Sequence, residues 1–181
     1  MQDSGQVVVL SGPPGAGKST VSRLLTDARS PSVHLHSDDF WANIVKGGIP
    51  PYLPESSRQN QVVMGVVAAA ALGYAQGGYY VVVDGVVGPW YIAEFRIAAA
   101  ATPVPLHYVI LRPDEQTTLS RAVARGDSAL TEPEPVRHMH RQFASLGEYE
   151  SHAIDTTSLD APATSALISG GLAAGRFLLN P

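Results

Sequence analysis

Residues 12–19, with the sequence Gly-Pro-Pro-Gly-Ala-Gly-Lys-Ser, restrict the fold more than any other segment of this chain. The spacing matches the pattern G-x-x-x-x-G-K-[ST], in which glycines let the backbone wrap around an anion and point its N–H groups inward. The β-branched run before it, residues 6–11, predicts a buried strand, and apolar positions 21, 24 and 25 after it predict an amphipathic helix. Because a helix N-terminus also attracts anions, the three parts together predict a phosphate site.

Two side chains of this loop are expected to act on a nucleotide. Lys18 brings its charge to the β- and γ-phosphates of ATP, and the Ser19 hydroxyl is placed to hold Mg²⁺. The alternative is a glycine-rich turn with an incidental lysine, which the flanking strand and helix disfavour. The predicted nucleotide contacts in this segment are Gly12, Pro13, Pro14, Gly15, Ala16, Gly17, Lys18, Ser19 and Thr20.

Short apolar runs alternate with helical stretches along the chain, which is typical of an α/β fold with a parallel sheet covered on both faces. Without an internal repeat or linker, residues 1–181 are interpreted as one domain. Ligands bind such sheets at the carboxyl ends of the strands, so functional residues are expected there. The predicted strands span residues 7–11, 33–37, 79–84, 105–111 and 151–155. The predicted helices span residues 18–29, 56–76, 89–101, 114–126 and 160–176, the last one capped by Asp160.

The composition limits the location and the partners of the chain. Hydrophobic residues make up 45% and charged residues 15% of it, which indicates a compact globular protein. A net charge of −4 argues against a broad basic surface for duplex nucleic acid, and the absence of cysteine excludes disulfides and thiolate chemistry. The longest apolar stretch, residues 62–75, is shorter than the roughly 18–20 residues that span a bilayer. The first residues also lack the features of a secretion signal, so we expect a cytoplasmic protein without a membrane partner.

Two aspartates follow the second predicted strand. Asp38 is expected to orient an acceptor hydroxyl and to take up its proton during phosphoryl transfer. The alternative is structural, because Ser37 or an aspartate could cap a helix that begins near Phe40. Asp39 is interpreted as that cap or as a substrate ligand.

Four histidines occur in two closely spaced pairs. His34 and His36 point to the same side of a strand, which suits a metal pair. No third ligand is evident near them in the sequence, so we interpret them as structural residues. His138 and His140 are two apart on a predicted helix and diverge, so they predict no site.

Asp84 ends the third predicted strand, where an acidic residue can hold Mg²⁺ directly or through water. The alternative is a carboxylate that caps the following loop. Trp90 and Tyr91 come shortly afterwards, and they form either a wall of an acceptor pocket or part of the core.

Arginines are concentrated in the segment after the fourth predicted strand. Arg121 and Arg125 are four residues apart, so both lie on one helix face and can converge on phosphate. Residues 126–135 are predicted to form a loop of a lid, with the whole lid at about residues 121–141, that closes over the triphosphate. Arg137 and Arg141 repeat the spacing, but surface ion pairs are the favoured interpretation for them.

Four segments occur in an order that resembles a known family: residues 12–19, 37–39, 83–85 and 121–127. Together they resemble the small P-loop kinases that include chloramphenicol phosphotransferase, and more distantly the gluconate and shikimate kinases, polynucleotide kinases and zeta toxins. The resemblance covers nearly the whole length. It implies a three-layer fold whose five-stranded parallel sheet has the order 2-3-1-4-5, together with a helical lid. It also implies ATP-dependent transfer to a hydroxyl.

The same resemblance implies roles for individual residues. Asp38 corresponds to the carboxylate that acts as the base, and Arg121 and Arg125 correspond to the lid arginines. The loop that contacts adenine follows the last strand, which gives Asp155 and Thr156 as further nucleotide contacts.

An ATP- and Mg²⁺-dependent kinase for a small hydroxyl-bearing molecule is therefore the leading hypothesis, with antibiotics, sugars and sugar acids as candidate acceptors. Asp39, Arg58 and Trp90 are its candidate acceptor contacts. A polynucleotide or nucleoside kinase is the alternative within the class. A GTP-dependent switch would need an Asn-Lys-x-Asp segment, which this sequence lacks. A binding protein without catalysis is disfavoured by the intact set of Lys18, Ser19 and Asp38.

Overall fold

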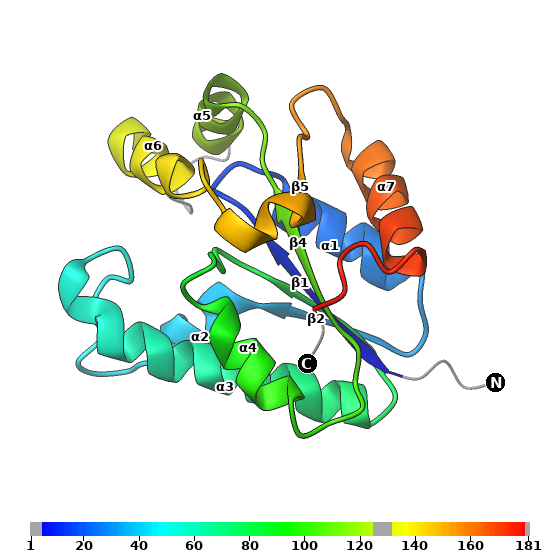
Figure 1. The fold of residues 1–181 in the computed structure, drawn as a ribbon. Coiled ribbons are helices and arrows are strands. Elements are labelled where there is room, and N and C mark those ends of the chain that lie inside the picture. Colours follow the sequence, from blue (N-terminus) through cyan, green and yellow to red (C-terminus); the bar gives the residue numbers. More distant parts are fainter. Residues whose placement is uncertain (1–4, 125–131, 180–181) are drawn as a thin grey trace.

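One five-stranded parallel sheet forms the centre of the molecule (Figure 1). The computed structural model describes residues 5–124 and 132–179. The strand order is β2-β3-β1-β4-β5, which confirms the predicted fold class. The strands are β1 (Gln6–Ser11), β2 (Ser32–His36), β3 (Tyr80–Asp84), β4 (Leu106–Leu111) and β5 (Ala153–Ile154).

Helices cover both faces of the sheet and bury two apolar layers (Figure 1). The helices α3 (Ser57–Gln76) and α4 (Ile92–Ala99) pack on one face, whereas α1 (Lys18–Asp27) and α7 (Ala161–Ala173) pack on the other. β1 and β3 are almost completely buried and rich in valine because both of their faces are covered in this way.

The remaining short elements are mostly joined to the carboxyl ends of the strands. α2 (Ser37–Ala42) follows β2, and α5 (Glu115–Val123) and α6 (Pro133–Gln142) follow β4. Two 3₁₀ helices, η1 (Pro54–Ser56) and η2 (Gly147–His152), precede α3 and β5. Figure 1 shows α5, α6 and the start of α3 at the same end of the sheet.

Capping residues fix several helix boundaries where the sequence predicts them. The Asp160 carboxylate accepts a hydrogen bond of 2.8 Å from the Ala163 N–H at the start of α7. Gly77 ends α3, and Gly78, with φ at 89°, turns the chain toward β3. None of the helices in the described part of the chain combines the length and apolar character that a membrane span needs.

The largest errors of the sequence-based prediction lie at two strand ends. Ser37 belongs to α2 and not to β2, so the helix that was expected near Phe40 begins three residues earlier. β5 has two residues instead of five, because residues 151 and 152 belong to η2 and Asp155 follows the end of the strand. The rest of the β4 edge is covered by the chain after α7, where the Tyr108 N–H donates to the Phe177 carbonyl oxygen at 2.9 Å.

Candidate active site

The loop between β1 and α1 adopts the backbone that its glycines predict. Gly12, Gly15 and Gly17 have φ values of 142°, 85° and 92°, a region that favours glycine. Lys18 is only 7% exposed, and its Nζ donates hydrogen bonds to the carbonyl oxygens of Gly12 at 2.8 Å and Pro13 at 2.9 Å. No side chain caps α1 at Gly17, so the first N–H groups of this helix are available to an anion.

Asp84 lies beside this loop and is completely buried at the end of β3. Burial opposes its ionisation, but contacts with His34, His36 and Ser19 and the charge of His36 outweigh this effect and lower its pKa. Its Oδ2 atom makes no hydrogen bond of ordinary geometry within the described residues. A buried carboxylate oxygen beside a hydroxyl suits a hard cation, so Ser19 and Asp84 fit the expected Mg²⁺.

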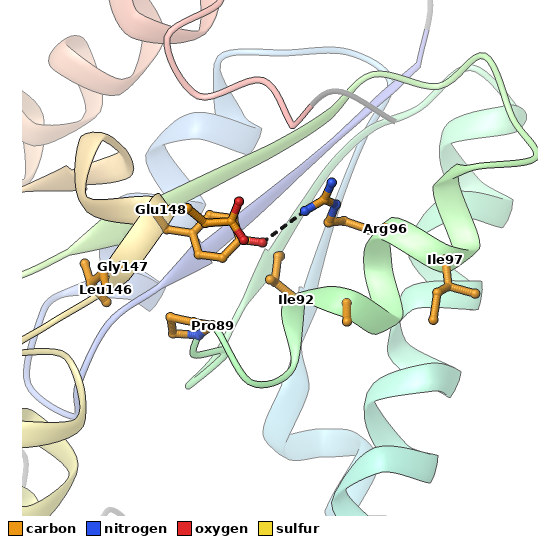
Figure 2. A pocket seen from close by; sticks show the side chains of 9 residues that line it. Pro89, Ile92, Arg96, Ile97, Leu146, Gly147 and Glu148 are labelled. Atoms are coloured by element: carbon orange, nitrogen blue, oxygen red, sulfur yellow. Dashed lines mark hydrogen bonds between the residues drawn. The ribbon is translucent and has the colours of Figure 1, made fainter.

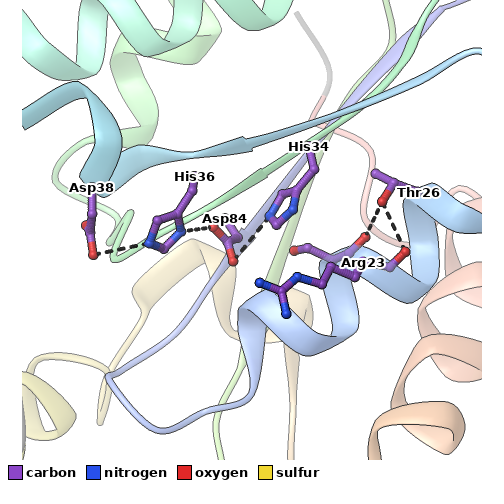
Figure 3. A network of polar contacts seen from close by, with 7 residues as sticks. Arg23, Thr26, His34, His36, Asp38 and Asp84 are labelled. Atoms are coloured by element: carbon purple, nitrogen blue, oxygen red, sulfur yellow. Dashed lines mark hydrogen bonds and ion pairs between the residues drawn. The ribbon is translucent and has the colours of Figure 1, made fainter. Parts of the chain in front are cut away.

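Two imidazoles hold Asp84 from the neighbouring strand (Figure 3). His36 Nδ1 hydrogen-bonds Asp84 Oδ1, and His34 Nε2 lies 3.5 Å from Asp84 Oδ2. The hydrogen bond to Asp84 raises the pKa of His36 against the opposing effect of burial, and the nearby carboxylates Asp38 and Asp39 raise it further. The described residues contain no group of three or more His, Cys, Asp or Glu side chains that could hold a metal ion.

Asp38 lies on the other side of the His36 ring. Its Oδ2 atom is 3.5 Å from His36 Nε2 (Figure 3). The alternative capping role is wrong for this segment, because the residue before α2 is His36 and no side chain caps the helix. Asp38 is therefore available to a ligand, and its side chain is 75% exposed. Asp39 is also exposed and follows Asp38 in the first turn.

The strand register explains why these groups meet. β2 pairs with β3 so that His36 is the partner of Asp84, and His34 lies two residues earlier on the same face. The sequence-based interpretation missed this partner, because 48 residues separate His36 from Asp84 in the chain. The expected strand order, with β2 beside β3, was the signal that could have found it.

Three hydrogen bonds fix the loop that follows Asp84. The Ser11 hydroxyl donates to the Val87 carbonyl oxygen at 2.7 Å and accepts from the Val87 N–H at 3.0 Å. The Tyr108 hydroxyl donates to the same carbonyl oxygen at 2.6 Å. Trp90 then extends from this loop to the end of α6, with its ring 5.8 Å from the Phe143 ring, and it remains 45% exposed. Trp90 is therefore only partly buried and packs against Phe143.

Arg121 and the loop after β5 lie side by side. Arg121 donates a hydrogen bond of 3.4 Å to the Leu159 carbonyl oxygen, which places the guanidinium against the segment expected to contact adenine. Within that segment, Asp155 accepts hydrogen bonds from the backbone N–H and the hydroxyl of Thr157, and Thr156 is buried. Arg125 and residues 126–131 of the expected lid lie outside the described residues.

Arg137 and the two histidines of α6 contact neighbouring groups. Arg137 pairs with Glu134 at 2.7 Å and with Glu115 at 3.4 Å, in agreement with the surface interpretation. His140 Nε2 lies 3.0 Å from the Pro113 carbonyl oxygen, whereas His138 contacts Gln142 at 3.4 Å, so the two histidines do diverge.

Two open pockets flank this end of the molecule, and neither is lined by the phosphate loop. One, of about 610 Å³, lies between α4 and η2, where Arg96 donates a hydrogen bond of 3.2 Å to the Tyr149 hydroxyl (Figure 2). The other, of about 660 Å³, lies between α3 and the chain after α2 and includes Arg58 and Phe40. Phe40 lines this pocket but Asp38 does not, because the two residues are two positions apart on α2 and their side chains point in nearly opposite directions.

A phosphate-binding loop between β1 and α1 of a sheet ordered β2-β3-β1-β4-β5 defines a P-loop nucleotide-binding protein with a kinase-type fold. The family model described as "AAA domain" matches residues 7–146, and the chain belongs to this family. No curated protein matches the sequence significantly.

Solved structures resemble the chain over nearly its whole length. A gluconokinase from Sinorhizobium meliloti 1021 is 21% identical with a TM-score of 0.69, over 96% of this chain and 94% of that one. An APS kinase from Mycobacterium tuberculosis, in complex with AMPPNP and APS, is 16% identical with a TM-score of 0.67, over 94% and 98%. The tunicamycin resistance protein of Deinococcus radiodurans is 16% identical with a TM-score of 0.64, over 98% and 99%. These matches confirm the expected P-loop kinase fold, but they show no specific likeness to chloramphenicol phosphotransferase.

Proposed function

We propose that this protein is an ATP- and Mg²⁺-dependent phosphotransferase that moves the γ-phosphate to a hydroxyl group of a small molecule. The observation that carries the proposal is the arrangement around His36. A buried carboxylate beside the phosphate loop, Asp84, lies on one side of this ring, and an accessible carboxylate, Asp38, lies on the other. The first suits the donor nucleotide and the second suits an acceptor.

The donor nucleotide would bind along the loop. The backbone N–H groups of the loop and the N-terminus of α1 hold its phosphates, and Lys18 exchanges its contacts with Gly12 and Pro13 for phosphate oxygens. Ser19 and Asp84 would hold Mg²⁺, which would supply positive charge to balance the negative charge that develops on the phosphates.

The acceptor would approach from the side of Asp38. This carboxylate accepts the proton of the acceptor hydroxyl while the hydroxyl oxygen forms a bond to the γ-phosphorus. The bond between that phosphorus and the oxygen bridging to the β-phosphate breaks, and ADP leaves. Arg121, beside the loop that follows β5, would contact the nucleotide.

The acceptor is proposed only as a class. Solved structures with a similar fold include a gluconokinase, an APS kinase and a tunicamycin resistance protein, so the fold alone does not identify the acceptor. Trp90 is half-exposed beside the loop after Asp84, which supports a role in the wall of the acceptor site. Arg58 opens onto the pocket on the far side of α2, which weakens its assignment as an acceptor contact.

An ADP-release screen tests this function. Sugars, sugar acids, aminoglycosides, chloramphenicol, nucleosides and 5′-hydroxyl oligonucleotides are incubated with ATP, Mg²⁺ and the wild-type protein. We expect at least one small hydroxyl-bearing compound to raise ADP release above the rate without acceptor, and the Asp38→Asn variant to lose the increase. A response to oligonucleotides alone would favour the polynucleotide kinase instead, and no response to any compound would contradict the proposal.

A further inference from the structure

The imidazole of His36 lies between the two carboxylates of the proposed mechanism, Asp84 at the metal site and Asp38 at the acceptor. His36 Nδ1 contacts Asp84, and His36 Nε2 lies 3.5 Å from Asp38 (Figure 3). We propose that His36 is a positioning residue that orients both carboxylates at once, Asp84 toward the metal site and Asp38 toward the acceptor. This inference rests on the proposed phosphotransferase function.

The metal side of this link concerns a buried group. Asp84 is 0% exposed and extends from the last position of β3, so its orientation depends on protein contacts and not on water. His36 provides the hydrogen bond to Oδ1, while Oδ2 lies 3.5 Å from His34 and makes no hydrogen bond of ordinary geometry in the described residues. The contact with His36 thus leaves Oδ2 as the oxygen available to a cation. Such partners of metal ligands set both orientation and affinity.

The acceptor side concerns an exposed group. The Asp38 side chain is 75% exposed in the first turn of α2. In the parts of the chain that the structure describes, the His36 ring is the only partner of its carboxylate. An exposed carboxylate without a partner samples several rotamers, and a base that is out of position by an ångström loses much of its effect. The contact with His36 restricts this freedom.

The position of His36 makes the double contact possible. It is the last residue of β2, it is the register partner of Asp84, and α2 with Asp38 begins directly after it. An imidazole carries two polar atoms on opposite parts of one rigid ring, so a single side chain reaches both carboxylates. An asparagine at position 36 would place its amide near the position of Nδ1 and keep only the contact with Asp84. A glutamine there would place its amide near the position of Nε2 and keep only the contact with Asp38.

This difference gives the experiment. The His36→Asn and His36→Gln variants are compared with wild type in two measurements: binding of Mn²⁺ in the presence of ATP by electron paramagnetic resonance, and kcat and KM for transfer to the acceptor found in the screen. The matched controls are His138→Asn and His138→Gln, which change an exposed histidine of α6.

The two variants are expected to fail in different ways. His36→Asn keeps the contact with Asp84, so Mn²⁺ affinity stays within about twofold while kcat falls about 10–100-fold, the usual range for partners of site residues. His36→Gln keeps the contact with Asp38, so Mn²⁺ affinity falls about 10–100-fold and kcat at saturating Mn²⁺ falls less. KM for the acceptor changes little in either variant. Equal losses in both variants, or no loss in either, would overturn the proposal.

A double-mutant cycle covers the case of a poorly folded variant. In the Asp38→Asn background, His36→Asn is expected to have no further effect on kcat, because the group that it positions is already absent. An undiminished effect would show a merely structural role for His36. If the wild-type protein phosphorylates no acceptor, the proposed function and the claim that His36 orients Asp38 are both overturned. The Mn²⁺ titration then tests separately whether His36 orients Asp84.

Discussion

The donor and acceptor halves of the site differ in how firmly the fold holds them. Lys18 is 7% exposed and begins α1, directly after the phosphate loop, and Asp84 is 0% exposed at the end of the central strand β3. The Asp38 side chain is 75% exposed and Trp90 is 45% exposed, on a short helix and a loop. The donor half is therefore part of the core packing, whereas the acceptor half can change without loss of the core. Under the proposed function, this division would keep the nucleotide contacts in the core while the acceptor contacts could vary.

The strongest test of the donor half is Lys18→Ala. We expect kcat/KM for ATP to fall about 10³-fold, because the variant removes a preorganised charge from both the bound and the reacting phosphates. Isothermal titration measures the loss of ATP affinity, and initial-rate kinetics measure the loss of reaction rate. Lys46→Ala, which changes the only other lysine of the chain, is the control and should match wild type. An unchanged ATP affinity in Lys18→Ala would remove the phosphate-loop assignment.

The strongest test of the acceptor half is Asp38→Asn. Transfer is expected to fall about 10²-fold or more while ATP affinity is retained, since the amide cannot take up the acceptor proton. The neighbouring Asp39→Asn is the matched control, with an expected loss of less than about tenfold, because in the described part of the chain Asp38, and not Asp39, forms the ion pair with His36. A larger loss in the control would assign the base to Asp39.

The donor half was also the more predictable half. Residues 12–19 and their flanking strand and helix form a local pattern, because a loop backbone and a helix N-terminus are determined by nearby residues. The sheet order came from a family resemblance, and the structure confirms it. The link between His36 and Asp84 depends on strand pairing over 48 residues, so no local pattern shows it. The start of α2 was misplaced because its first turn has no side-chain cap to mark it.

A pair of glycine variants tests how tightly the donor loop is packed. A Cβ atom on Gly15 would collide with the Thr118 carbonyl oxygen of α5, whereas a Cβ atom on Gly17 would meet open space. Both residues have positive φ, so Gly17→Ala is expected to cost about 1–2 kcal/mol from strain alone. Gly15→Ala should cost about 1–3 kcal/mol more, which lowers Tm by about 2–4 °C per kcal/mol in a protein of this size. Thermal unfolding of the two variants measures the difference, and equal Tm values would contradict the close approach of α5.

The smallest expected effect concerns the pH dependence of stability. The folded-state pKa of His36 is raised above 6.5, so its pairing with Asp84 stabilises the fold fully below that pH. This contribution is lost as the pH rises through the folded-state pKa. His36 is partly exposed, so we expect less than about 1 kcal/mol. The free energy of unfolding is measured with urea in EDTA at about pH 5.5 and about pH 8.5. It should be larger for wild type than for His36→Asn only at the lower pH. A larger stability difference between wild type and His36→Asn at the higher pH would contradict the predicted direction of the pH dependence.

The most direct test of the proposed phosphotransferase activity follows the γ-phosphate itself. ATP labelled at the γ-phosphate is incubated with Mg²⁺, the acceptor panel and either wild type, Asp38→Asn or Asp39→Asn, and the products are separated. We expect wild type and Asp39→Asn to place the label on an acceptor hydroxyl, and Asp38→Asn to bind ATP but leave the acceptor unlabelled. Label found only in inorganic phosphate, or equal labelling of the acceptor by Asp38→Asn, would contradict this expectation.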